Sequence, residues 1–398
     1  LEQLETNTTF TISPDIDANS PELVKVIVEF EQAPAKIEVM KQAAKGKKLS
    51  SSAANEKVEQ SHKAFKEHVQ SLKSQKNVTN YKVEDVNITR EYKKAINGVS
   101  MTLPGVAVKD LLQSGVVKHV FKDYEVKVDP PVKTKEAIDP KMADSIPQIG
   151  VDKLHAENIK GKGIKVGVLD TGIDYNHPDL KDVYKGGYDF VDDDADPMET
   201  TYEDWINAGK PTYPGRVYYT SHGTHVAGTI AAQQKNGVDY AVKGVAPEVD
   251  LYAYRVLGVW GGGDTAGILA GIDQAITDGM DVINMSLGAA TNNPLYATSV
   301  AVNNAMLSGV VTVVAAGNAG PNEKTLGSPG AAALGISVGA SDVSMTIPTF
   351  SGSVSTEKFE NMQLLGKDFS DKLEDLQGQS IPIVFAGLGK ATDFAGKD

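Results

Sequence analysis

Cysteine, long apolar segments and an excess of basic residues are all missing from this 398-residue sequence. Without cysteine, neither disulfide bonds nor thiol chemistry can contribute. No apolar stretch approaches the roughly 20 residues of a membrane-spanning helix. The formal net charge of −13 argues against a nucleic-acid partner, because phosphate binding needs a surplus of Lys and Arg on some face. We therefore expect a globular protein without a membrane span and without a nucleic-acid partner.

Residues 1–123 divide into a polar start and an α+β pattern. Residues 1–20 are rich in Thr, Asn and Asp, which predicts a disordered lead-in. Residues 21–123 alternate strand and helix patterns in the order β-α-β-β-α-β, which is that of a ferredoxin-like domain. The expected strands are 23–30, 82–92, 95–103 and 116–121, and the expected helices are 53–74 and 106–112.

A linker is expected at 124–147. This segment contains Pro130, Pro131 and Pro140 together with many Lys and Asp residues, and it has no hydrophobic period. Such a composition favours an extended chain. Processing between the two flanking domains would fall in this linker.

Residues 148–345 alternate apolar strand runs with helical stretches, which predicts a doubly wound parallel sheet of the α/β class. The expected elements are strand 164–169, helix 222–232, strand 250–256, helix 266–277, strand 282–286, helix 298–308, and strands 310–315 and 336–340. Because crossovers between parallel strands are right-handed, the residues that follow strands 164–169 and 310–315 should lie on the same side.

Three motifs stand at or near this edge. Asp170-Thr171-Gly172 ends the strand 164–169, His222 opens a small-residue helix in the run Ser-His-Gly-Thr-His-Val-Ala-Gly, and Asn318 follows a strand after Gly317. Together they resemble the subtilisin-like serine proteases (subtilases), whose triad runs Asp, His, Ser along the chain. The resemblance implies that Asp170 orients the imidazole, that His222 is the general base and that Asn318 donates its amide to the oxyanion.

Each motif has another interpretation. Asp-Thr-Gly also occurs in aspartic proteases, but these need two such carboxylates and no second motif is present. His222 and His225 have a spacing that could hold a metal, although the sequence offers neither Cys nor a third nearby His. Asn318 alone could be an ordinary turn residue. The combination of all three motifs favours the catalytic interpretation.

The family's nucleophile segment, Gly-Thr-Ser-Met-Ala-x-Pro, is missing from these residues. The first residue is Leu1, without a signal peptide, and we expect either that one was removed or that the sequence begins within a longer gene. The expected protein is a secreted, extracellular serine endopeptidase zymogen, of which this chain is an inactive part. The alternative is a truncated pseudoprotease whose N-terminal domain binds and inhibits other subtilases.

Further residues follow from the resemblance. Two glycine-containing segments would pair with the main chain of a protein or peptide substrate as an added strand: Gly261, Gly262 and Gly263, and Ser286, Leu287 and Gly288. Ala315, Ala316 and Gly317 would floor a roomy pocket for an apolar side chain at P1, the substrate residue before the cleaved bond. The ferredoxin-like domain resembles the inhibitory (I9-type) pro-domain, the protease's intramolecular inhibitor, although a generic α+β module has the same pattern.

No cofactor is expected for the chemistry, and structural Ca²⁺ is the metal to consider. Asp192, Asp194 and Asp196 crowd hard oxygen ligands into one loop, although most acidic loops are simply solvated. Asp179 matches a position where many subtilases bind structural calcium. From residue 346 the sequence departs from the family and resembles the opening of a protease-associated (PA) domain at 346–398, as inserted into large secreted bacterial subtilases.

Overall fold

The structure is a computed structural model. It describes residues 11–74, 81–128, 142–237, 241–341, 350–354, 356–362 and 378. The chain divides into two compact units, 1–343 and 344–398. In the second unit β13 (Phe350–Val354) and β14 (Glu357–Met362) form an antiparallel hairpin. Most of the expected PA domain lies outside the described residues, so that assignment stays a prediction.

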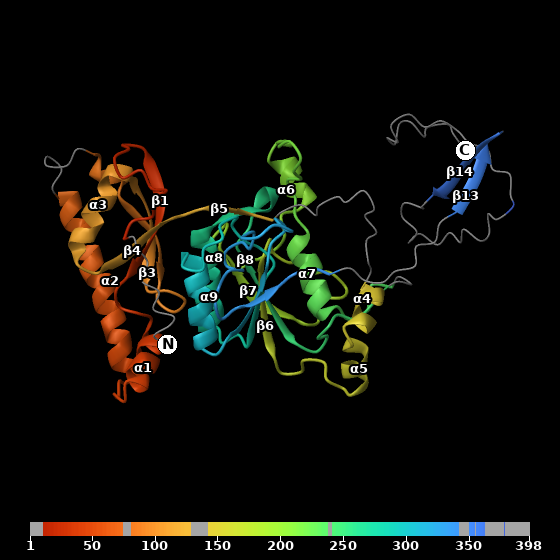
Figure 1. Cartoon of the computed structure of the whole chain (residues 1–398), viewed down its shortest axis with the longest axis horizontal. Helices are drawn as coiled ribbons and strands as arrows, with labels where there is room; N and C mark the ends of the chain where they lie inside the picture. Colours follow the sequence, from red (N-terminus) through yellow and green to blue (C-terminus); the bar gives the residue numbers. More distant parts are fainter. Residues whose placement is uncertain are drawn as a thin grey trace. The chain divides into compact units, whose positions relative to one another are not determined.

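The N-terminal domain is a four-stranded antiparallel sheet in the order β2-β3-β1-β4, with helices over one face (Figure 1). Its strands are β1 (Leu23–Phe30), β2 (Asn87–Tyr92), β3 (Gly98–Pro104) and β4 (Val117–Lys122). Helix α2 (Ser51–Ser74) lies between β1 and β2 in the chain, and α3 (Val108–Leu111) lies between β3 and β4. Phe30, Phe65 and Leu111 are fully buried between sheet and helices. The predicted ferredoxin-like fold is confirmed.

Two parts of this domain differ from the sequence-based expectation. Helix α1 (Ala35–Ala44) precedes α2 and was not predicted, because its Lys- and Ala-rich sequence has little apolar periodicity. Residues 11–20, expected to be disordered, lie along β4: the Ser13 amide donates to the Val120 carbonyl at 2.8 Å, and Ile16 is buried. Backbone hydrogen bonds to an edge strand, together with a buried apolar side chain, thus hold this polar segment in place.

The remainder of the first unit, after the N-terminal domain, is called the second domain. It contains a six-stranded, all-parallel sheet in the order β12-β11-β10-β6-β8-β7. The strands are β6 (Lys165–Asp170), β7 (Tyr184–Asp189), β8 (Asp250–Arg255), β10 (Val282–Met285), β11 (Val311–Ala315) and β12 (Ile336–Val338). Strands β8 and β7 lie on one side of β6, and the later strands β10, β11 and β12 lie on its other side. The direction in which the chain builds the sheet therefore reverses at β6. This reversal is where open α/β sheets place their ligands, at the carboxyl ends of the strands.

Helices cover both faces of this sheet (Figure 1). Val166 and Val168 of β6 pack with α7 (His222–Ala231), whereas Leu169 packs with α8 (Thr265–Thr277) and α9 (Ala297–Leu307) on the opposite face. Shorter helices are α4 (Met142–Gln148), α5 (Val151–Ala156) and α6 (Tyr202–Asn207). The predicted doubly wound architecture is confirmed. Among the described helices, none is both long enough and apolar enough to cross a membrane.

The N-terminal sheet packs with its second face on α8 and α9. Ile27, Tyr92 and Phe121 belong to the same buried cluster as the inner residues of these two helices. The carboxylate of Asp273 on α8 accepts hydrogen bonds from three successive amides of the β2–β3 turn, those of Lys93 (3.1 Å), Lys94 (2.7 Å) and Ala95 (2.8 Å). The two domains are thus joined by an apolar contact with a polar anchor.

We predict that Asp273→Ala loosens this contact, because three amides lose their common acceptor at a cost of about 1–3 kcal/mol. The amides of Lys94 and Ala95 exchange their hydrogens when the N-terminal domain separates from α8. Their exchange should then accelerate by roughly 5- to 150-fold. Gln274→Ala, at the next position along α8, is the matched control and should leave both amides unchanged. Equal protection in D273A and the unsubstituted chain would contradict the prediction.

Candidate active site

Asp170 and His222 form a hydrogen-bonded pair at the carboxyl end of β6. Asp170 is the last residue of the strand and 1% exposed, and its Oδ1 lies 2.7 Å from His222 Nδ1. Oδ1 also accepts the amide of Thr171 at 2.7 Å. With Nδ1 hydrogen-bonded to a carboxylate, the other ring nitrogen, Nε2, is available as a base. The His222 side chain is 37% exposed and can therefore be approached from solvent.

The opposing influences on His222 raise its pKa. Burial by itself lowers the pKa, but the hydrogen bond and charge of Asp170, joined by the charge of Glu199, outweigh burial. Protonated His222 therefore contributes to the stability of the folded chain, fully at pH values below the ordinary pKa of histidine. This contribution is lost as the pH rises through the raised pKa. An imidazole whose protonated form is stabilised by neighbouring carboxylates is suited to taking up a proton during a reaction.

The start of α7 is held close to β6. The Gly223 amide donates to Thr171 Oγ1 at 2.9 Å, so the residue after Asp170 caps the helix that carries His222. A Cβ on Gly223 would lie 2.1 Å from the Gly172 carbonyl oxygen and 3.1 Å from Asp170 Cβ. Glycine is therefore required at 223 for the imidazole to reach the carboxylate.

The residues predicted around Asn318 share the sheet edge with this pair. Asn318 follows β11, two strands from β6, and is exposed. Ser286, Leu287 and Gly288 follow β10, the strand between β11 and β6, and Ser286 Oγ accepts the side-chain amide of Asn284 at 3.0 Å. Ala315 ends β11, and Ala316 and Gly317 lead from it to Asn318. The structure describes no contact of Asn318 with the Asp170–His222 pair, so its role stays a prediction.

The three glycines proposed to bind substrate are paired with the chain's own preceding segment. Strand β9 (Gly262–Asp264) pairs antiparallel with β5 (Glu125–Lys127), with Val126 opposite Gly263 and Lys127 opposite Gly262. The Val128 amide continues the ladder to the Gly261 carbonyl at 2.9 Å. A Cβ on Gly263 would lie 2.3 Å from the Val256 carbonyl oxygen, so this strand must carry glycine there. The expected linker thus begins with a short strand, and residues 129–141 lie outside the described residues.

The four acids considered for calcium are not brought together. Asp192 pairs with Arg255 Nη1 at 2.6 Å, Asp194 Oδ1 accepts the Asp196 amide at 2.8 Å, and Asp196 accepts the Tyr175 hydroxyl at 2.8 Å. Asp179 Oδ1 accepts the amide of Lys235. Among the described residues, no group of three or more His, Cys, Asp or Glu side chains is arranged to hold a metal. Calcium binding by these acids therefore stays a prediction.

Sequence reasoning missed two buried groups near the site. Arg255 ends β8 beside Asp170 and donates through Nη1 to Asp189 at 2.5 Å and through Nη2 to Thr200 Oγ1 at 2.8 Å. Glu199, 6% exposed, accepts hydrogen bonds from Thr220 and Thr224. An Arg ending an apolar strand and a Glu in an acidic loop gave no periodic signal. Only the partners, which come from distant segments, distinguish them.

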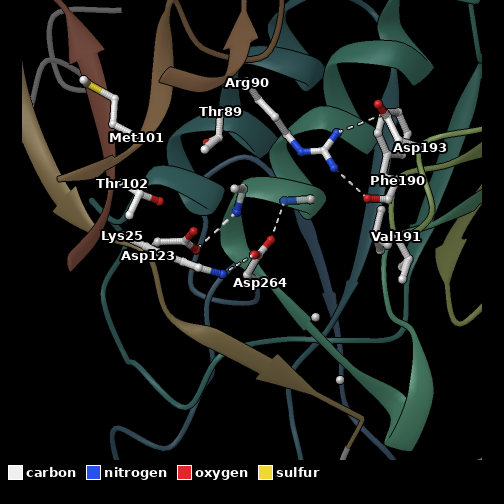
Figure 2. Close-up of a pocket in the computed structure, with 15 residues that line it drawn as sticks. Lys25, Thr89, Arg90, Met101, Thr102, Asp123, Phe190, Val191, Asp193 and Asp264 are labelled. Atoms are coloured by element: carbon white, nitrogen blue, oxygen red, sulfur yellow. Dashed lines mark hydrogen bonds and ion pairs between the residues drawn. The ribbon is translucent and has the colours of Figure 1, made fainter. Parts of the chain in front are cut away.

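A cavity of about 480 Å³ lies where the N-terminal domain meets β9 and the start of α8 (Figure 2). Two carboxylates face it at the helix N-terminus: Asp123 accepts the Ala266 amide at 3.3 Å, and Asp264 accepts the Gly267 amide at 2.9 Å. Lys25 Nζ lies 3.4 Å from Asp264 Oδ2. Burial, followed by the negative charge of Asp264, raises the pKa of Asp123 to about 7.

Comparison with known proteins identifies the family of both domains. A family model described as "Subtilase family" matches residues 161–363, and one described as "Peptidase inhibitor I9" matches residues 25–129. The chain is 40% identical to the minor extracellular protease Vpr of Bacillus subtilis (strain 168) over 394 residues, which are 96% of this chain and 44% of Vpr. It is 37% identical to subtilisin E of the same strain over 264 residues, which are 65% of this chain and 59% of subtilisin E. The chain thus spans about half the length of these curated relatives.

We predict that Gly223→Ala breaks the Asp170–His222 hydrogen bond, because the added Cβ forces α7 away from Gly172. The low-field proton resonance of the His222 Nδ1–H should disappear, and the pKa of His222 should fall. The matched control is Gly228→Ala on the same helix, where a Cβ meets nothing within 4 Å. It should leave the resonance in place and stabilise the helix by up to about 1 kcal/mol. A persistent resonance in G223A would refute the steric argument.

We also predict that stability depends on the protonation of Asp123. Its pKa is raised in the folded state, so its carboxylate costs stability progressively as the pH rises from the ordinary value of 3.8 to about 7. Asp123→Asn keeps an acceptor for the Ala266 amide without the charge. The difference in Tm between D123N and the unsubstituted chain should therefore grow in favour of D123N between pH 4 and 7. Glu125→Gln, an exposed neighbour on β5, is the control, and a pH-independent difference for D123N would disprove the prediction.

Proposed function

The chain belongs to the subtilase family, and we propose that it carries the inhibitory pro-domain and the Asp–His–Asn part of the catalytic domain of a secreted serine endopeptidase precursor. The main support is the 2.7 Å hydrogen bond between Asp170 and His222 at the carboxyl edge of a parallel sheet. The name of the relative Vpr, an extracellular protease, supports secretion.

In this proposal His222 is the general base and the nucleophile is a serine outside these 398 residues. Nε2 of His222 accepts the serine proton as Oγ attacks the substrate carbonyl, and the same proton then passes to the leaving amine. Asp170 stabilises the imidazolium formed between these steps. The Asn318 amide donates to the oxyanion of the tetrahedral intermediate, a contribution of roughly 3–4 kcal/mol in such sites. The chemistry requires no cofactor.

The N-terminal domain acts as the intramolecular inhibitor. Its tail strand β5 pairs with β9, and this pairing occupies the backbone groups with which an extended substrate would hydrogen-bond. Processing in the linker 124–147 would then have to precede or accompany release of the tail. The small residues Ala315, Ala316 and Gly317 favour an apolar substrate side chain at P1.

The alternative function is a pseudoprotease that inhibits other subtilases. The antiparallel β5–β9 pairing is equally the contact by which a pro-domain would inhibit in trans. In the intact chain, however, the chain's own catalytic domain already pairs with β5. The intact chain should therefore inhibit an active subtilase weakly, and nanomolar inhibition by it would favour the alternative.

The proposal is tested by determining the coding sequence beyond Asp398 and expressing the complete protein. We predict an in-frame Gly-Thr-Ser-x-Ala-x-Pro segment and hydrolysis of a peptide substrate by the processed protein. His222→Ala should reduce kcat by roughly 10⁶-fold, since members of a catalytic triad act as a unit. The 398-residue chain alone should be inactive. Activity of that chain at a rate unchanged in H222A would assign the reaction to another site and refute the proposal.

A further inference from the structure

Glu199 is a buried carboxylate to which the Asp–His–Ser mechanism gives no role. It lies in the segment between β7 and α6 and is 6% exposed. One oxygen, Oε2, accepts the Thr220 hydroxyl at 2.5 Å. The other, Oε1, accepts the Thr224 amide at 2.9 Å and its hydroxyl at 3.2 Å. Three donors thus fix the carboxylate in one orientation.

The Thr224 amide belongs to the first turn of α7, two residues after His222. The N-cap residue Ser221 makes no side-chain capping bond, so the free amides of this turn depend on other segments. Thr171 accepts from Gly223, and Glu199 accepts from Thr224. The helix that carries His222 is therefore held at its N-terminus by β6 and by the segment around Glu199.

A second set of hydrogen bonds fixes that segment. The Thr200 amide donates to the Thr220 hydroxyl at 3.1 Å, and the hydroxyl of Thr200 accepts from Arg255 at 2.8 Å. Arg255 is paired with Asp189 and Asp192, so its positive charge is neutralised locally. The negative charge of Glu199 has no comparable cation among the described residues. It acts in the same direction as Asp170 and raises the pKa of His222.

We propose that Glu199 is a positioning residue for His222, which anchors the first turn of α7 and places a second buried negative charge at the N-terminus of the helix that carries the imidazole. This inference rests on the proposed role of His222 as the general base. During the reaction the imidazole becomes positively charged, and a fixed negative charge stabilises that form without reorganisation. Asp170 supplies the hydrogen bond at Nδ1, and the negative charge of Glu199 acts on the imidazole electrostatically from the N-terminus of α7.

The charged groups that act on His222 come from two elements. Asp170 lies on β6 and Glu199 on the segment after β7. On α7 itself, His225 stands one turn further along and is exposed. The effect of Glu199 can therefore be separated from that of Asp170 by single substitutions.

The test is an NMR titration of His222 in the intact 398-residue chain, with His222→Asn identifying its signal among the seven histidines. Glu199→Gln keeps the shape of the side chain and removes its charge, and it should lower the pKa of His222. Asp170→Asn should lower it further. Glu203→Gln, an exposed glutamate four residues on, is the matched control and should change nothing. An unchanged pKa in E199Q, with the fold retained by the ¹H–¹⁵N spectrum, overturns the proposal.

Thr220→Val distinguishes charge from structural support. This variant removes one donor to Glu199 and the acceptor of the Thr200 amide but keeps the carboxylate, so the pKa of His222 should remain above that in E199Q. An equal fall in both variants would mean that loop order alone is responsible and would overturn the electrostatic role. If E199Q does not fold, Glu199→Asp is used in its place. The shorter side chain moves the carboxylate back by one methylene group. The pKa of His222 should then lie between its values in D170N and in the unsubstituted chain. A value equal to that of the unsubstituted chain refutes the proposal.

The outcome of D170N separates this inference from the proposed function. If D170N leaves the pKa of His222 unchanged, the Asp170–His222 pair itself is wrong and the proposed function fails with it. If D170N lowers the pKa and E199Q does not, only the role of Glu199 is refuted.

Discussion

The burial of the Asp170 carboxylate is the constraint on which the site depends. A carboxylate that is 1% exposed at the end of a central strand must be compensated by donors, because an uncompensated buried charge is strongly destabilising. The Thr171 amide and the His222 ring both donate to Oδ1, while Oδ2 is buried without a partner among the described residues. The imidazole is therefore a main source of compensation, and the position of α7 is tied to the strand.

Small residues make this arrangement sterically feasible. At Gly223 the backbone of α7 lies against the Gly172 carbonyl, and at Gly263 strand β9 lies against the Val256 carbonyl. In both places a methyl group would require a backbone shift. The first contact sets the distance from the imidazole to the carboxylate, and the second holds β9 where β5 pairs with it. Close backbone packing at these two glycines thus determines which groups can meet at this edge of the sheet.

The sequence predicts this protein well where a local pattern carries the information, and poorly where a distant partner does. The parallel sheet follows from apolar runs separated by helical stretches, and the pairing of Asp170 with His222 was expected from the resemblance of their motifs to those of the subtilases. Strand β7 was missed because Gly186 and Gly187 interrupt its apolar pattern. The acids 192–196 were considered for calcium because the cation that pairs with Asp192 is Arg255, 63 residues away. Glu199 was missed for the same reason, since its donors belong to other segments.

The contact between the two domains combines buried apolar residues with buried carboxylates. Apolar residues such as Tyr92 and Phe121 are fully or almost fully buried against α8 and α9, which favours docking. Burial also raises the pKa values of Asp123 and Asp273 at the same helix, so their charged forms are held at a cost. An interface made only of apolar residues would dissociate slowly once formed. The cost of burying the charge of Asp123 offsets part of the apolar gain, whereas the three amides that donate to Asp273 partly compensate its burial. The tail strand β5 is held by backbone hydrogen bonds to β9, a kind of contact that any extended chain can make.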